Sequence, residues 1–279
     1  MPSYDTPEPI TAVLEFEVGN VRITASKRTS TVVEVLPSNG AEEADVRAVQ
    51  QTKVTYSNGV LTVKGPKKRS LFGRQGSIDV TVEVPAGSHL RGTSPMADYT
   101  CEGPLGECRV KISLGDIRLA EAGDTNLRTD HGDIGIDRAV GNAEIYGAGR
   151  IDIGEIAGTA TVKNGNGETV IGEITGDLKA NSSNGRITVG VAHASVEAKS
   201  ANGGIRIDEV ARGVVQLQTA VGDLEVGIRQ STSAWLDVSS RFGTVRNSLG
   251  AAEGPGTSDA TVEIHARTGA GDVVIRRAA

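Results

Sequence analysis

The sequence predicts an all-β protein: a right-handed parallel β-solenoid of about nine coils of 17–19 residues, preceded by an N-terminal antiparallel β cap. The first observation is a recurring glycine with spacings of 17, 17, 18, 18, 18, 19, 21 and 28 residues. A period of this size is typical of stacked structural units. The second observation is an alternating aliphatic pattern after each glycine. The third is composition, with 36 glycines and only 3% aromatic residues. The recurring glycines are Gly115, Gly132, Gly149, Gly167, Gly185, Gly203, Gly222, Gly243 and Gly271.

Each repeat predicts a short strand with one buried face. The positions two and four residues after the glycine are aliphatic in eight of nine copies, as in Ile117 and Leu119. A period of two places both residues on the same face of a strand, and repetition between copies predicts that equivalent strands stack. A second strand precedes each glycine, which marks a turn expected to need a positive φ. Parallel coils of this kind should wind right-handed.

The first 88 residues predict a β-rich cap, and residues 89–279 the repeat region. Alternation is clearest in Ile78–Val84, and Asn58-Gly59 between two apolar runs is a strong hairpin signal. The segment from Ala41 to Gln51 is expected to be a loop with at most two helical turns. In the late repeats, Asn247 interrupts the aliphatic row, and residues 250–260 predict a loop before the last coil. The loosened coils and the tail are expected to cover the far end of the stack.

Composition and charge exclude several classes of function. The net charge is −6, and residues 1–86 contribute none of it. A mildly acidic solenoid is a poor candidate for nucleic-acid binding. No apolar run approaches the roughly 20 residues of an integral membrane span. The first ten residues lack a secretory pattern, so the expected location is cytoplasmic. A disulfide between Cys101 and Cys108 is geometrically possible, but a cytoplasmic chain favours free thiols. No cofactor or metal is expected.

One loop is the candidate partner-binding site. Residues 64–74 hold five cations, with two large apolar side chains among them. Such a loop suits an anionic membrane, nucleic acid or an acidic protein. The alternative is an ordinary solvated hairpin loop whose Leu and Phe pack on the sheet. The candidate residues are Lys64, Lys67, Lys68, Arg69, Leu71, Phe72 and Arg74.

Two rows of polar residues predict structural ladders. The residue after each glycine is often charged, as in Asp116 and Arg150, and mixed signs favour surface ion pairs over a calcium site. Asn166, Asn184 and Asn202 precede three successive glycines and predict a hydrogen-bonded asparagine column. No phosphate loop, nucleophile elbow or histidine pair is present, so no catalytic residue is assigned.

The chain resembles a known bacterial family. The strand Ile78–Val84 ends in Pro85-Ala86-Gly87, and repeats such as Gly115-Asp116-Ile117 follow. This succession is similar to the bacterial putative-adhesin family of β-strand-repeat proteins, often described only as a domain of unknown function. The resemblance covers residues 10–277 and implies a β-solenoid with an N-terminal β-rich cap. It implies no agreed activity and supplies no catalytic residues.

These observations predict a non-enzymatic scaffold or adhesin-like interaction module with an unidentified protein partner. Its long polar faces would be presented to that partner, and homo-oligomerisation is left open. The first alternative is a self-assembling structural element of bactofilin type, in which end coils stack between subunits. The second alternative is a carbohydrate-active β-helix enzyme, which would need a general acid and base in a cleft.

Overall fold

The computed structural model describes residues 2–66, 75–249 and 260–278. Strands hold 69% of the residues and helix 3%, which confirms the all-β class. Contacts divide the chain into two units, Met1–Arg138 and Ala139–Ala279. Both units contain stacked solenoid coils, so this division does not test the predicted boundary at 88/89.

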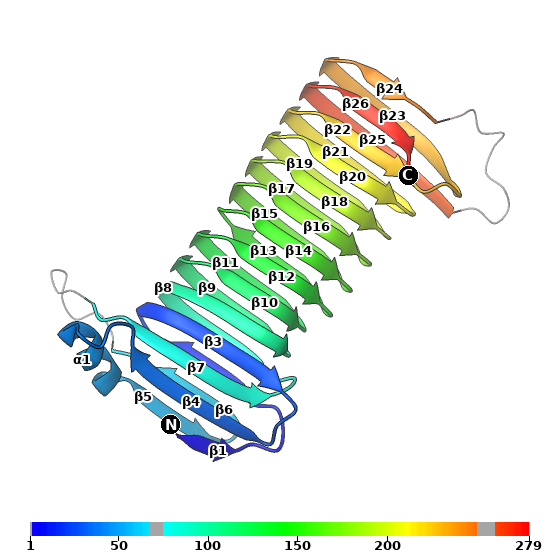
Figure 1. The fold of residues 1–279 in the computed structure, drawn as a ribbon. Helices are drawn as coiled ribbons and strands as arrows, with labels where there is room; N and C mark the ends of the chain where they lie inside the picture. Colours follow the sequence, from blue (N-terminus) through cyan, green and yellow to red (C-terminus); the bar gives the residue numbers. More distant parts are fainter. Residues whose placement is uncertain (1, 67–74, 250–259, 279) are drawn as a thin grey trace. The chain divides into compact units, whose positions relative to one another are not determined.

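Unit 1 joins the cap to the first coils (Figure 1). Its elements are β1 (Ser3–Asp5), β2 (Thr11–Glu15), β3 (Val18–Ser26), β4 (Ser30–Pro37), α1 (Glu43–Gln51), β5 (Lys53–Ser57), β6 (Val60–Lys64), β7 (Ile78–Pro85), β8 (His89–Pro104), β9 (Cys108–Leu114), β10 (Ile117–Ala122), β11 (Thr125–His131) and β12 (Ile134–Ala139).

The cap is only partly antiparallel. Antiparallel pairing joins β1 to β4, β4 to β7 and β5 to β6. By contrast, β2 lies parallel between β6 and β8, and β3 lies parallel between β7 and β8. The reason is apolar stacking, because Ala12 faces Leu61 on one side and Leu90 on the other, all three buried. Coil stacking therefore begins inside the predicted cap.

Two local features of the cap follow from its sequence. Asn58 and Gly59 have φ values of 50° and 73°, which suit a type I′ hairpin turn and confirm the predicted β5–β6 hairpin. The helix is slightly longer than expected, at nine residues, or about two and a half turns. The Asp45 carboxylate accepts hydrogen bonds from the backbone N–H groups of Asn39 (3.0 Å) and Ser77 (2.8 Å), which ties this helix to its flanking segments.

Unit 2 is a stack of coils, each made of two strands. Its strands are β13 (Ala143–Gly147), β14 (Ile151–Ile156), β15 (Ala160–Asn166), β16 (Thr169–Ile174), β17 (Leu178–Asn184), β18 (Ile187–Ala192), β19 (Val196–Asn202), β20 (Ile205–Val210), β21 (Gly213–Val221), β22 (Leu224–Ile228), β23 (Thr232–Phe242), β24 (Val245–Asn247), β25 (Ala260–Ala270) and β26 (Val273–Arg277).

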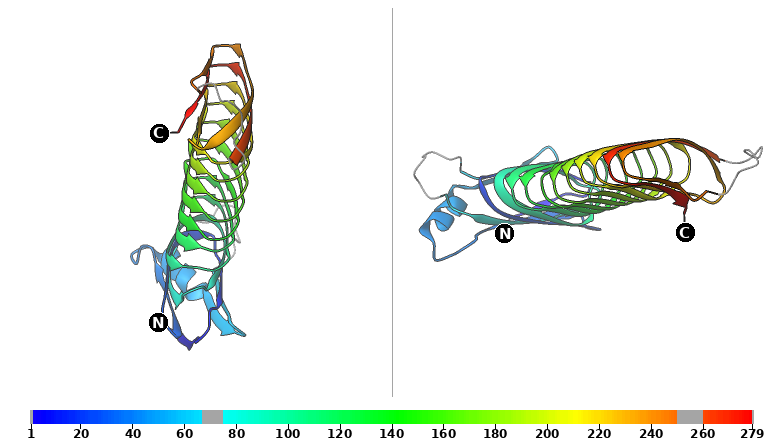
Figure 2. Two further views of the ribbon diagram at one scale, coloured as in Figure 1. Left: turned by 90° about the vertical axis from the view of Figure 1, so that its right-hand side faces the viewer. Right: turned by 90° about the horizontal axis from the view of Figure 1, so that it is seen from above.

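The aliphatic rows of unit 2 lie inside the coils, as predicted. Leu178 is opposite Val196, which is opposite Val215, so equivalent residues stack at intervals of 18 and 19 residues. Ile171 and Val189 stack in the facing row, and both are fully buried. Figure 2 shows these coils from two further directions as narrow loops laid one upon another.

The last coils do not stack in chain order. The β25–β26 coil lies between the β21–β22 coil and the β23–β24 coil, because β25 pairs with both β21 and β23. This corrects the expectation that the chain's tail covers the far end. The inner residues explain the order. Val262 and Ile264 of β25 are buried, whereas Asn247 of β24 would leave an amide inside an apolar row. The coil with the polar inner residue therefore lies outermost.

Eight of the nine repeat glycines adopt the expected positive φ, between 111° at Gly167 and 158° at Gly243. Gly149 is not among them, so the prediction is wrong for that turn. The turns also approach one another closely. A Cβ on Gly185 would lie 2.0 Å from the carbonyl oxygen of Gly167, the glycine one coil earlier. Each of the eight turn glycines with a positive φ leaves room for the backbone of a neighbouring coil.

The two cysteines are free thiols, as expected, and both are buried. Burial raises the pKa of Cys108 to about 12, with a smaller contribution from the Glu107 carboxylate, and burial raises the pKa of Cys101 well above its usual range. We expect iodoacetamide at pH 8 to label Cys108 on the order of 1,000-fold more slowly in the folded protein than in urea.

Mass spectrometry of timed samples measures these labelling rates.

The buried thiols should also make stability depend on pH. Because the unfolded thiols ionise near pH 8.5 and the folded ones do not, the free energy of unfolding should fall as the pH rises above that value. Rapid labelling of either thiol in the folded protein would contradict the burial.

Candidate interaction surface

The predicted partner-binding loop lies almost wholly outside the described residues. This applies to Lys67, Lys68, Arg69, Leu71, Phe72 and Arg74. Lys64 is described and ends β6. Its ammonium group lies 3.4 Å from the Glu15 carboxylate of the neighbouring β2, and both side chains are about half exposed. One cation of the predicted site is therefore already paired.

A second group of cations lies on the outward face of unit 1. Arg91 of β8 is directly opposite Arg109 of β9, and Lys111 of β9 is opposite Arg128 of β11. These strands line a shallow groove of about 310 Å³, here called the basic groove, whose lining residues are Arg91, Gly92, Thr93, Arg109, Val110, Lys111 and Asn126. Adjacent strands are about 4.8 Å apart, so the cations lie close together.

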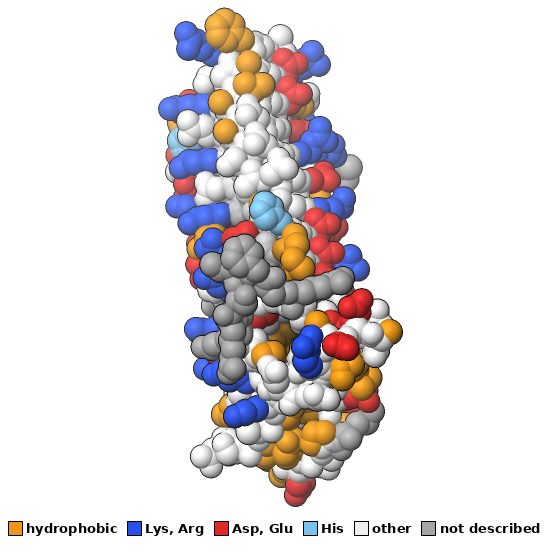
Figure 3. Space-filling view, turned by 90° about the vertical axis from the view of Figure 1, so that its left-hand side faces the viewer, with side chains coloured by type: hydrophobic (Ala, Val, Ile, Leu, Met, Phe, Trp, Pro, Cys, Tyr) orange, Lys and Arg blue, Asp and Glu red, His pale blue; other side chains and the backbone are white. Residues whose placement is uncertain are grey.

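Ion pairing compensates only half of these cations. Arg109 pairs with Glu107 at 2.5 Å, and Arg128 pairs with Asp130 at 3.1 Å. Neither Arg91 nor Lys111 forms an ion pair with any residue that the structure describes. Four cations against two carboxylates leave an excess of two positive charges. Figure 3 shows that Lys and Arg recur along both margins of the stacked coils, with Asp and Glu among them.

The basic groove has a signal in the sequence that the inner rows alone do not reveal. Arg91, Arg109 and Asn126 are separated by 18 and 17 residues, and Thr93, Lys111 and Arg128 by the same intervals. Aligning all outward positions of the repeats, rather than the inner rows alone, would have placed these side chains together. Lys64 belongs to the same cross-strand row as Lys111, with Glu15 and Thr93 between them.

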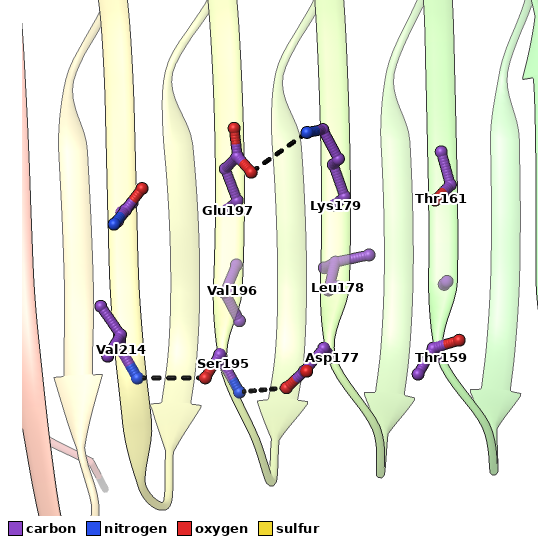
Figure 4. A pocket seen from close by; sticks show the side chains of 11 residues that line it. Thr159, Thr161, Asp177, Leu178, Lys179, Ser195, Val196, Glu197 and Val214 are labelled. Carbon is purple, nitrogen blue, oxygen red and sulfur yellow. Dashed lines mark hydrogen bonds and ion pairs between the residues drawn. The ribbon is translucent and has the colours of Figure 1, made fainter.

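A groove of unit 2 has the opposite character, because its charges are paired. This groove of about 370 Å³ crosses β15, β17, β19 and β21 (Figure 4). Glu197 contacts Lys199 at 2.6 Å and Lys179 at 3.3 Å, and these hydrogen bonds lower the pKa of Glu197. At the turns that precede β17 and β19, the Asp177 carboxylate accepts from the Ser195 backbone N–H at 3.1 Å (Figure 4). Its polar groups therefore mainly connect neighbouring coils.

The row of polar residues after the glycines connects coils in two ways. The expected ion pairing is present between Arg150 and Glu168 of the next coil, at 3.6 Å, and aspartates of the row also bind backbone N–H groups. The Asp98 carboxylate accepts from the backbone N–H of Asp116 at 2.8 Å, and the Asp116 carboxylate accepts from that of Asp133 at 2.9 Å. Each carboxylate thus connects its turn to the next coil. The asparagine column is confirmed between Asn184 and Asn202, since the Asn202 side chain donates to the Asn184 side-chain oxygen at 3.0 Å. Asn166 lies opposite Asn184 in the strand register.

The surroundings of His265 do not suit general-base chemistry. His265 has one ring nitrogen 2.7 Å from the Glu263 carboxylate and the other 3.3 Å from Asp237. These two carboxylates raise the pKa of His265 and favour the imidazolium form, which cannot accept a proton. Within residues 2–66, 75–249 and 260–278, no three His, Cys, Asp or Glu side chains gather to hold a metal ion. No helix in those ranges has the length and apolar character of a membrane span.

Comparison with protein families identifies the architecture. The family model named Toastrack DUF4097 matches residues 12–278, almost the whole chain. The chain belongs to this family. The Toastrack match confirms the resemblance drawn from the strand and repeat motifs, and the family is a domain of unknown function. The match begins within β2, where parallel stacking also begins.

Several solved structures are similar to this Toastrack chain at low identity. One is described as a putative adhesin from Bacteroides fragilis, with 15% identity, a TM-score of 0.40, and coverage of 98% of this chain and 95% of that one. Another is described as a putative adhesin from Parabacteroides distasonis, with 10% identity, a TM-score of 0.37 and the same coverage. A third, from the same species, is described as a putative lipid binding protein, with 10% identity, a TM-score of 0.26, and coverage of 99% and 95%. No curated protein matches the chain.

Proposed function

We propose that this Toastrack chain is a non-enzymatic, adhesin-like interaction module whose basic groove binds an acidic surface of a partner protein. The observation that carries the proposal is the pair of uncompensated cations, Arg91 and Lys111, on a chain with a net charge of −6. A local positive surface on an acidic protein attracts an acidic partner. We also propose a cytoplasmic location.

The fold suits this role because strand register fixes the spacing of the cations. Arg91 and Arg109 are held opposite each other by neighbouring strands, so the backbone positions that carry these two cations are already fixed before a partner binds. Arginine also offers paired donors that match a carboxylate. Binding through such a surface should depend strongly on salt, because the groove is open to solvent.

The test reverses the charge of the groove. We expect Arg91→Glu/Lys111→Glu to weaken binding of poly-L-glutamate at least tenfold, which corresponds to about 1.4 kcal/mol. Arg22→Glu/Arg118→Glu is the matched control, because it makes the same charge change on β3 and β10 of the same unit. Isothermal titration calorimetry at two salt concentrations measures the affinity of both double variants for poly-L-glutamate. Equal weakening by the two double variants would contradict a specific groove.

The natural partner is sought with the same pair of variants. Proteins retained from a host lysate by the unaltered chain and by the control, but lost by Arg91→Glu/Lys111→Glu, are candidates for the partner. A double-stranded DNA probe checks the predicted absence of nucleic-acid binding. A variant neutralised at Lys67, Lys68 and Arg69 tests whether the predicted loop adds to the groove.

A further inference from the structure

The outermost coil of unit 2 ends in an open strand edge. Among the described residues, β23 pairs with β25 alone and β24 with β26 alone. The β23 edge is eleven residues long, whereas β1 and β5, which likewise have one partner each in unit 1, have three and five residues. Short edge strands are a common protection against further pairing. The long β23 edge lacks that protection.

The inner face of this coil is incompletely covered. In β25, Val262, Ile264 and Ala266 are no more than 2% exposed, but the residues opposite them, Ala234, Leu236 and Val238, are only half-buried. Large apolar side chains at the same end are also exposed, to 57% at Trp235, 69% at Phe242 and 44% at Val245. A further strand laid along β23 would bury apolar surface as well as pair its backbone groups.

The charges on β23 are complementary to those of a second β23 strand that runs antiparallel to it. Asp237 and Arg241 lie four residues apart, with Ser239 midway. Antiparallel pairing of two β23 strands about Ser239 places each Asp237 opposite the other strand's Arg241 and each Leu236 opposite Phe242. Arg241 forms no ion pair with a described residue, and its guanidinium lies 5.3 Å from the Phe242 ring centroid. Asp237 contacts Arg267 at 2.9 Å.

From this complementarity we propose that β23 pairs antiparallel with β23 of a second copy of this chain, giving a two-fold dimer. The same patch then serves both partners, which is the condition for a closed two-fold interface. A strand from an unrelated protein would satisfy the backbone but not this reciprocal charge pattern. The interface is independent of the basic groove, because it uses different residues on the other unit.

Charge reversal on the full-length chain tests the dimer. In sedimentation velocity, we expect the unaltered protein to dimerise with rising concentration. Arg241→Asp and Asp237→Arg should each weaken dimerisation at least tenfold, because each places like charges opposite one another. An equimolar mixture of the two variants should form a heterodimer, since every pair in it is again of opposite sign.

Lys199→Asp is the matched control, because it changes a cation to an acid on the interior strand β19, and it should leave dimerisation unchanged. Melting temperatures show whether each variant is folded. Leu236→Lys is a second test of the dimer that leaves Asp237 and Arg241 unchanged. It should weaken dimerisation, because an inward-pointing charge blocks edge pairing. An unaltered protein that stays monomeric, one that forms open filaments, or variants that fail to complement each other would overturn the proposal.

Discussion

Ile171→Asp is expected to cause the largest loss of stability in the molecule, about 4 kcal/mol or more. Ile171 is fully buried and lies between Ile153 and Val189 in the inner row of unit 2. A carboxylate there would lose its water and find only aliphatic neighbours in that row. Losses of this size are rare for single substitutions and arise from buried, unpaired polar groups. Because each coil depends on its neighbours, the damage should spread along the stack.

Val170→Asp is the matched control, because it introduces the same carboxylate one residue earlier on the same strand, at a partly exposed outward position. Urea unfolding followed by circular dichroism measures both variants. We expect a large shift of the midpoint for Ile171→Asp and a change within about 1 kcal/mol for Val170→Asp. Similar midpoints for the two variants would mean that residue 171 is not inside the coil.

The inner rows were predictable because two periods coincide in the sequence. The alternation of Ile187 and Val189 sets the buried face of one strand, and the 18-residue interval sets which strands stack. Both signals are local in the repeat, so no knowledge of distant contacts was required. The same reasoning located the hairpin at Asn58-Gly59, where the turn residues themselves demand positive φ.

The order of the last coils could not be obtained from that repeat pattern. The repeats share one strand pattern. The pattern therefore does not show which of the last two coils stacks on the β21–β22 coil and which lies outermost. The choice depends on which coil better tolerates an exposed inner face, and Asn247 was the only local sign of it. The parallel pairing of β2 with both β6 and β8 could not be predicted for a different reason, because its partners lie far away in the chain.

The candidate surface was harder to predict than the fold. The basic loop was conspicuous because its cations are consecutive in the sequence, and only Lys64 of that group falls within the described residues. The basic groove is made of single cations contributed by successive coils, such as Arg91 and Lys111. Its existence becomes visible only when strand register brings these positions side by side.

Gly185→Ala is the second substitution with a large expected effect, a loss of about 3 kcal/mol or more. Gly185 has a φ of 142°, and an added Cβ would lie 2.0 Å from the Gly167 carbonyl oxygen and 2.6 Å from its carbon. An L-residue is strained at that φ. The collision is with backbone, which cannot rotate away as a flexible side chain can. The turn must therefore move, and with it the hydrogen bond from the Gly185 N–H to the Asn202 carbonyl at 2.8 Å.

Gly165→Ala separates this effect from the general cost of replacing a glycine. The two glycines lie on the same unit, but a Cβ on Gly165 would meet only an ordinary contact, 3.5 Å from the Ala148 Cβ. Its effect should stay within about 1 kcal/mol, with the lost freedom of the unfolded chain acting in favour of the variant. Thermal and urea unfolding of both variants give the comparison. If Gly185→Ala were as stable as Gly165→Ala, the close approach of successive turns would not be what selects glycine there, and the coil spacing itself would have to be larger than the structure shows.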